Sequence, residues 1–176
     1  MPPPSSAAPC RRRRLLLVAA APAALAACGF QLRQAPEFAF DSIFVAMPNN
    51  SALGTELRRQ IAASGKVRVV PDARQIDTAQ VVLDSLVDQR EKVVVGLNAA
   101  GQVTEFQLRL RFRFRLRSRA DGRVLIPDTE LLQQRDISFS ESAVLAKEAE
   151  EQLLYRNMQT DIVQQIMRRL AAVRQV

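Results

Sequence analysis

Hydrophobic and polar residues alternate without interruption along one stretch of the chain, residues 104–119. From Phe106 to Leu116 every second residue is Phe or Leu, and from Arg109 to Arg119 every residue of the other parity is arginine. Because successive side chains of a strand point to opposite faces, this pattern predicts a half-buried β-strand with one apolar face and one guanidinium face. The arginines repeat at roughly 6.6 Å, twice the rise per residue. Like charges at that spacing need water, carboxylates or bound anions beside them.

The patterns that precede this strand are shorter. Residues 42–47 are mostly apolar and predict a strand that Pro48 ends. Apolar residues then recur at a spacing of four before Gly65, which predicts a helix that reaches about residue 63. The other elements predicted here are a short edge strand at 67–70, a turn at 75–78 and a long strand that begins near residue 79.

Turn residues and a change of period organise the second half of the chain. Residues 96–101 predict a hairpin loop into the arginine strand, and Asp121-Gly122 predicts the next turn. Beyond it, residues 124–126 continue as a strand, which Pro127 and Asp128 are expected to break. The last predicted elements are a strand at 131–139 and a helix at 142–173, whose apolar stripe includes Met158 and Met167 as core residues.

The order strand, helix, strands, helix predicts an α+β fold. We expect a two-layer sandwich in which a mixed or antiparallel sheet of about four long strands has two helices packed on one face. The helices should cover the Phe and Leu face of the central strand, and the arginines should point away from them. Cross-strand acids such as Asp84 or Asp136 are the expected partners of a solvated arginine face.

The amino-terminal residues are typical of an export signal. Arginines 11–14 precede a short apolar run and the sequence Leu25-Ala26-Ala27-Cys28. The apolar run is far below the ~20 residues that a spanning helix needs. The last four residues resemble the bacterial lipobox, which implies a signal peptide at residues 1–27 and acyl chains on Cys28. The alternative is an ordinary signal peptide in which this cysteine occurs by chance.

The resemblance to a lipobox also implies a cellular location and a domain organisation. Two or more acyl chains on one residue make a stable membrane anchor. Gly29 rather than aspartate follows the cysteine, which in the usual sorting rule favours the outer membrane. We therefore expect a lipidated amino-terminus and tether at residues 28–40 and a single α+β domain at residues 41–176.

Composition argues against several functions. Removal of the four leader arginines from 25 basic residues leaves 21, against 18 acidic residues, so bulk charge gives little support for nucleic-acid binding. The absence of histidine excludes a Ser-His-Asp triad and the usual zinc sites. Cys10 lies in the leader and Cys28 at the lipidation site, so we expect no disulfide. We expect neither enzymatic activity nor a cofactor, although acid counts alone do not exclude a carboxylate pair.

Three segments together resemble one known family, the lipopolysaccharide-assembly lipoproteins of the LptE group. They are Cys28-Gly29-Phe30-Gln31-Leu32-Arg33, Gly101-Gln102-Val103-Thr104-Glu105-Phe106-Gln107 and Leu145-Ala146-Lys147-Glu148-Ala149-Glu150. The resemblance implies a protein that sits inside the lumen of the outer-membrane β-barrel LptD, helps to assemble and plug it, and binds lipopolysaccharide. It also implies that the chain is not an enzyme. The rival interpretation is a periplasm-facing structural or cell-wall-binding lipoprotein.

The candidate lipopolysaccharide-binding residues are all basic, because guanidinium and ammonium groups bind lipid A phosphates. They are Lys147, Arg90, Lys92, Arg109, Arg111 and Arg113. Lys147 lies in the family's Ala-Lys-acid motif near a helix amino-terminus, where a cation is mildly unfavourable; pairing with Glu150 or Glu151 is the alternative. The arginine face has its own alternative, which is a solvated surface or one that faces the barrel wall.

Overall fold

The computed structural model describes residues 36–176. The predicted signal peptide at residues 1–27 and the predicted lipidation site Cys28 lie outside these residues. In chain order the elements are β1 (Ser42–Ala46), α2 (Ala52–Ala63), β2 (Arg68–Val70), the 3₁₀ helix η1 (Ala73–Thr78), β3 (Val81–Leu97), β4 (Val103–Ser118), β5 (Val124–Ser138), the 3₁₀ helix η2 (Glu141–Ala143) and α3 (Val144–Ala171).

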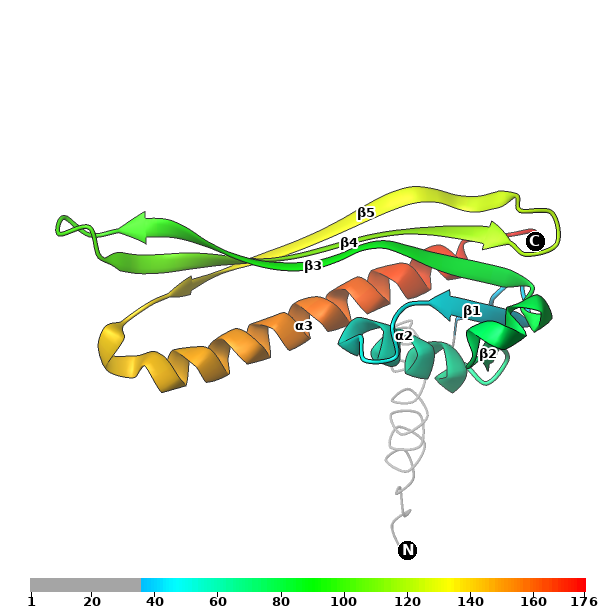
Figure 1. Cartoon of the computed structure of the whole chain (residues 1–176), viewed down its shortest axis with the longest axis horizontal. Coiled ribbons are helices and arrows are strands. Elements are labelled where there is room, and N and C mark those ends of the chain that lie inside the picture. Colours follow the sequence, from blue (N-terminus) through cyan, green and yellow to red (C-terminus); the bar gives the residue numbers. More distant parts are fainter. Residues whose placement is uncertain (1–35) are drawn as a thin grey trace, which may run out of the picture. The chain divides into compact units, whose positions relative to one another are not determined.

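The strands form one mixed sheet in the order β2-β1-β3-β4-β5. β1 runs parallel to both β2 and β3, whereas β3, β4 and β5 are antiparallel neighbours. Both α-helices lie on the same side of the sheet (Figure 1). The predicted α+β two-layer sandwich is therefore confirmed, with three long strands and two short ones.

The alternation along β4 is confirmed residue by residue. Five side chains of one parity are at most 1% exposed, and they are Leu108, Leu110, Phe112, Phe114 and Leu116. The arginines between them are half-buried or exposed. The apolar side chains belong to the same core cluster as the inward residues of α2 and α3. The arginine face therefore points away from the helices, as expected.

The two helices cover the apolar face with the stripes that their sequences predict. Ser51 caps α2, because its hydroxyl oxygen accepts a hydrogen bond from the backbone N–H of Gly54. The inward residues of both helices are buried, and they are Leu53, Leu57, Ile61, Met158, Ile162, Ile166, Met167 and Leu170. At about 1.5 Å per residue, the 28 residues of α3 extend about 42 Å beneath the long strands.

One predicted boundary is wrong. β5 continues through Pro127 and Asp128 instead of breaking there. Because β5 is the edge strand of the sheet, it needs backbone partners on one side only. The two residues also fall at an irregularity of the register, between the pairs Phe114–Thr129 and Leu116–Ile126. Proline is tolerated at such a position, and the strand continues.

Candidate functional site

A bulge in β3 decides which face of the sheet each charged residue occupies. Ser85 pairs with Phe114 and Val87 with Arg113, so β3 has one extra residue, Leu86, between them. Before the bulge, Asp84 pairs with Arg115 on the outer face. After it, Asp88, Arg90 and Lys92 pair with Phe112, Leu110 and Leu108, whose side chains point toward the helices. The candidate residues Arg90 and Lys92 therefore lie on the helix side.

Arg90 contacts α3 through two side chains. Its guanidinium lies over the Tyr155 ring, 5.2 Å from the ring centroid, and donates a hydrogen bond to Oε1 of Gln159 at 3.2 Å. Gln159 in turn donates from Nε2 to the Glu56 carboxylate at 2.8 Å. The Tyr155 hydroxyl donates to the backbone oxygen of Glu91 at 2.7 Å, at the edge of β3 that β1 does not cover. This network ties the hairpin to both helices.

The position of Tyr155 beside Arg90 changes the pKa of its phenol. Burial raises the pKa of its phenol, Glu151 and Glu91 raise it further, and Arg90 opposes them. The direction is the ordinary one for a phenol that leaves water, because burial disfavours the charged form.

Lys92 and Lys147 border a small pocket of about 70 Å³. Nζ of Lys92 lies 2.6 Å from the Glu151 carboxylate and 4.4 Å from the centroid of the Phe106 ring. Nζ of Lys147 donates to Ser138 Oγ at 3.0 Å and to Glu150 at 2.9 Å. The rest of the lining combines apolar residues with one serine and two glutamates, and they are Phe106, Ile137, Phe139, Val144, Ser138, Glu148 and Glu151. We refer to the two lysines and this lining as the lysine pocket.

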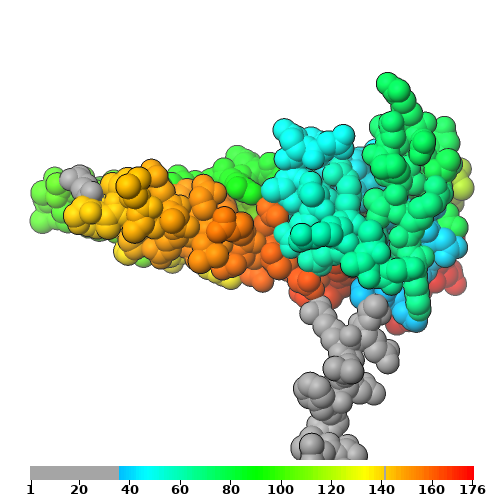
Figure 2. Space-filling view, turned by 90° about the horizontal axis from the view of Figure 1, so that it is seen from below, coloured from blue at the N-terminus to red at the C-terminus, as the bar shows by residue number. Residues whose placement is uncertain are grey.

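Exposed apolar side chains continue from the lysine pocket onto the hairpin tip and the start of α3. On the helix side they are Val94, which pairs with Phe106, and Val144 and Leu145 at the start of α3. Val95 and Leu97 are exposed near the hairpin tip, whereas Val93 pairs with Gln107 on the outer face. Leu145 is 81% exposed and Leu97 is 61% exposed. Figure 2, seen from the helix side, shows the start of α3 and the tip of the β3–β4 hairpin at the same end of the described domain. Cations and apolar surface therefore occur together there.

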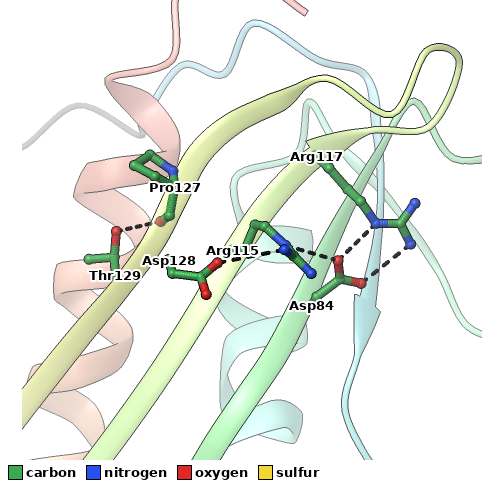
Figure 3. Close-up of polar contacts among 6 residues, drawn as sticks. All are labelled: Asp84, Arg115, Arg117, Pro127, Asp128 and Thr129. Atoms are coloured by element: carbon green, nitrogen blue, oxygen red, sulfur yellow. Dashed lines mark hydrogen bonds and ion pairs between the residues drawn. The ribbon is translucent and has the colours of Figure 1, made fainter.

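On the outer face, the carboxylate of Asp84 forms ion pairs with two arginines of β4 (Figure 3). Its carboxylate lies 2.8 Å from Nε of Arg117 and 3.7 Å from Nε of Arg115. Asp128 adds a second carboxylate 3.8 Å from Arg115. The predicted cross-strand role of Asp84 is confirmed, whereas Asp136 accepts a hydrogen bond from Gln107.

The next three arginines along β4 are less well neutralised. Nε of Arg111 lies 3.8 Å from Glu130 and, like Nε of Arg115, has no hydrogen-bond partner among residues 36–176. Nε of Arg109 donates to the side-chain oxygen of Gln107 at 2.8 Å. Among residues 36–176, Arg113 has no carboxylate within ion-pair distance. We refer to Arg109, Arg111 and Arg113 as the open arginine row.

The six candidate basic residues therefore form two groups on opposite faces of the sheet. Lys147, Lys92 and Arg90 lie between the hairpin and α3, and the open arginine row points away from the helices. The predicted alternative for Lys147, a pair with Glu150 or Glu151, is confirmed for Glu150, while Glu151 pairs with Lys92 instead. Sequence reasoning missed that pair and the contacts of Arg90 with Tyr155 and Gln159. Their signal was present, because Lys147, Glu151 and Tyr155 recur at a spacing of four and so share one face of a helix.

This arrangement defines a class of protein: an α+β sandwich with one end where lysine–glutamate pairs lie beside exposed apolar side chains, and with a second, guanidinium-rich face. In residues 36–176 no helix combines the length and the apolar character needed to cross a membrane. The family model described as LptE, lipopolysaccharide-assembly, matches residues 40–170. The chain belongs to the LptE family.

Solved structures agree with this assignment. The solution structure of uncharacterized lipoprotein B from Nitrosomonas europaea is 34% identical, with a TM-score of 0.68, over 82% of this chain and 91% of that chain. Rare lipoprotein B from Shewanella oneidensis is 21% identical, with a TM-score of 0.59, over 75% and 95%. A minor lipoprotein from Acinetobacter baumannii is 19% identical, with a TM-score of 0.60, over 77% and 94%. The last two share the fold. No curated protein sequence matches the chain.

Proposed function

We propose that this chain is an outer-membrane lipoprotein that assembles with and plugs the lipopolysaccharide-translocating barrel LptD. It binds lipopolysaccharide during insertion into the outer leaflet, and it does so without catalysis. Acyl chains on Cys28 anchor it to the membrane. Membership of the LptE family supports a role in lipopolysaccharide assembly, and the lipoprotein names of the solved neighbours support the anchor.

The observation that carries the lipopolysaccharide contact is the lysine pocket. Lipopolysaccharide is an amphiphile, with phosphates beside acyl chains, and its binding site must therefore offer cations next to apolar surface. Lys92 and Lys147 border Phe106 and Phe139, and exposed aliphatic side chains continue from there. Both lysines are already paired with carboxylates, so an incoming phosphate exchanges one anion for another. Because these ammonium groups are partly exposed, salt screens their attraction to phosphate, and the bound lipopolysaccharide is able to dissociate again.

Charge reversal tests this contact. Lys147→Glu and Lys92→Glu, and to a smaller extent Arg90→Glu, should each weaken lipopolysaccharide binding by about tenfold or more. Lys66→Glu is the matched control, because Lys66 is the remaining lysine of the chain and pairs with the exposed Glu37. Binding of purified lipopolysaccharide to the detergent-solubilised protein is the measurement. Unchanged binding by all three variants, or equal loss in the control, would refute the assignment.

A polar plug also fits the barrel. The lumen of an outer-membrane barrel is polar, and the outer face of this sheet is lined by arginines and carboxylates. Affinity purification of the acylated protein from outer membranes, with mass identification of its partner, tests the proposal. A stoichiometric barrel supports it, whereas sedimentation with peptidoglycan and no barrel supports the cell-wall-binding alternative. Mass analysis of the mature amino-terminus tests the anchor, because a mature chain without fatty acid would contradict it.

A further inference from the structure

We infer that a cleft beside the β4–β5 turn binds the headgroup of a phospholipid that carries both a phosphate and a primary ammonium group, as phosphatidylethanolamine does. The cleft has a volume of about 700 Å³ and lies between the end of η1, the β4–β5 turn and Val176. The turn is at the end of the sheet opposite the tip of the β3–β4 hairpin (Figure 1). We refer to this cavity as the turn cleft. The inference goes beyond the proposed function and rests on it only for the acyl anchor at Cys28.

The turn cleft presents two positive and two negative side chains. Arg119 forms an ion pair with Asp77, and Nε of Arg123 lies 3.8 Å from the Asp121 carboxylate. The four side chains are 41–73% exposed, so all of them remain accessible to a ligand. A ligand that is only an anion would meet two carboxylates beside the arginines, and one that is only a cation would meet two guanidiniums. A zwitterion is the ligand whose charges both find opposite partners.

Both arginines keep N–H donors for a phosphate. Arg119 donates from one Nη atom to Asp77, and Arg123 makes no side-chain hydrogen bond within residues 36–176. A guanidinium has five N–H donors, so most of them stay available. Two parallel hydrogen bonds from one guanidinium to a phosphate are a strong and directional contact. A phosphate is therefore able to bind without displacing either carboxylate.

The carboxylates in turn are acceptors for an ammonium group. Asp121 stays ionised, because the Ser118 hydroxyl and the backbone N–H of Arg123 donate hydrogen bonds that lower the pKa of its carboxyl. Ser118 is only 5% exposed, so this carboxylate is held in place on the cleft wall. A primary ammonium donates three hydrogen bonds. A quaternary ammonium is instead recognised by aromatic rings, and no aromatic side chain of residues 36–176 lines the cleft. The lining therefore favours ethanolamine over choline.

Chain length keeps this cleft near a membrane surface. Eleven residues lead from Cys28, the proposed acylation site, to Ala39, which lines the cleft. At no more than ~3.5 Å per residue they span at most roughly 38 Å. An acylated Cys28 therefore keeps the turn cleft within reach of phospholipid headgroups.

A titration of the full acylated protein in detergent with water-soluble glycerophosphoethanolamine tests the inference, with the amide chemical shifts of residues 118–123 as the readout. We expect saturable shifts for this headgroup and about tenfold weaker binding of glycerophosphocholine, glycerophosphoglycerol and inorganic phosphate. The test variant carries Arg119→Gln and Arg123→Gln and should also bind about tenfold more weakly. The matched control carries Arg59→Gln and Arg74→Gln, at two exposed arginines outside the cleft, and should bind as the wild type does.

A second measurement uses a bilayer. The acylated protein is reconstituted in vesicles of phosphatidylethanolamine with phosphatidylglycerol, or of phosphatidylcholine with the same fraction of phosphatidylglycerol, so the surface charge is equal. We expect amide hydrogen exchange at residues 118–123 to be about tenfold slower in the first vesicles, and this difference to vanish in the test variant. Equal exchange of the wild type in the two kinds of vesicle would overturn the inference.

The other outcomes are equally distinct. Equal binding of inorganic phosphate or glycerophosphoglycerol would show a simple anion site, and equal binding of glycerophosphocholine would show that the carboxylates do not select the ammonium; each result overturns the inference. Circular dichroism establishes that the double variant is folded, and if it is not, the single variant Arg123→Gln at the turn takes its place. The titration contains neither the barrel nor lipopolysaccharide, so its failure leaves the proposed function standing. A mature chain without fatty acid would contradict the anchor whether or not the headgroup binds.

Discussion

Asp84 is the charged residue of the outer face whose replacement has the best-defined consequence. Its carboxylate accepts hydrogen bonds from Nε and Nη2 of Arg117 at 2.8 and 3.4 Å and lies 3.7 Å from Nε of Arg115. Asp84→Asn removes the charge, keeps one acceptor oxygen, and leaves two guanidiniums on neighbouring outward positions without their shared counter-ion. The side chains are 20–38% exposed, so this is neither a buried pair nor a free surface pair.

The magnitude follows from that intermediate exposure. Hydrogen bonds to charged groups contribute about 1.5–3 kcal/mol when solvent is excluded, and fully exposed ion pairs about 0–1 kcal/mol. We therefore expect Asp84→Asn to lower the free energy of unfolding by about 2 kcal/mol. For a domain of this size that corresponds to a decrease of about 6 °C in Tm. Because salt screens exposed charges, the difference from the wild type should shrink as ionic strength rises.

Urea denaturation of the detergent-solubilised mature protein, followed by circular dichroism, measures the effect. Glu37→Gln is the control, since its pair with Lys66 is fully exposed and should leave the unfolding midpoint unchanged. A double-mutant cycle with Arg117→Gln isolates the coupling between the two side chains from other effects of each substitution. If Asp84→Asn unfolds at the wild-type urea concentration, the carboxylate does not stabilise this face. The ion pairs of Asp84 would then give its arginines no stability that Arg109, Arg111 and Arg113 lack.

Three other predictions concern the core, the phenol and the hairpin. Phe112 has no exposed surface, so Phe112→Ala should lower the free energy of unfolding by about 4 kcal/mol in urea titration. Tyr155 is the one tyrosine of the chain, and its raised pKa should place the midpoint of tyrosinate absorbance above about 10. The neutral phenol stabilises the fold fully below the pKa that Tyr155 has in the unfolded chain, and this stabilisation is lost as pH rises through its pKa in the folded protein. A Cβ at Gly96 would meet Glu105 Cβ at 2.9 Å, so Gly96→Ala should accelerate amide hydrogen exchange at the hairpin tip.

Each of these has a result that would contradict it. Leu132→Ala is the control for the core, because Leu132 is 48% exposed; equal losses in the two variants would show that Phe112 is not buried. The urea-unfolded chain is the reference for Tyr155, and a midpoint at or below that reference would rule out a buried phenol. Exchange that accelerates throughout the sheet in Gly96→Ala would show a global effect instead of a local one.

Much of the fold was predictable because β4 repeats one pattern over many residues. An alternation from Phe106 to Leu116 is compatible with a strand and incompatible with a helix, so the apolar face, its helix cover and the outward arginines followed from it. The break at Pro127 was predicted wrongly, because local sequence does not reveal that β5 lies at the edge of the sheet. An edge strand needs only one row of backbone partners, and that property belongs to the topology.

The candidate site was predictable as a set of basic residues but not as two surfaces. Asp84, Arg90 and Lys92 share one parity, so an unbroken β3 would place all three on the same face. The extra residue Leu86 reverses the parity, and it sends Asp84 outward to Arg117 while Arg90 and Lys92 turn toward α3. One inserted residue thereby separates the cations that lie beside apolar surface from those that lie in a flat row.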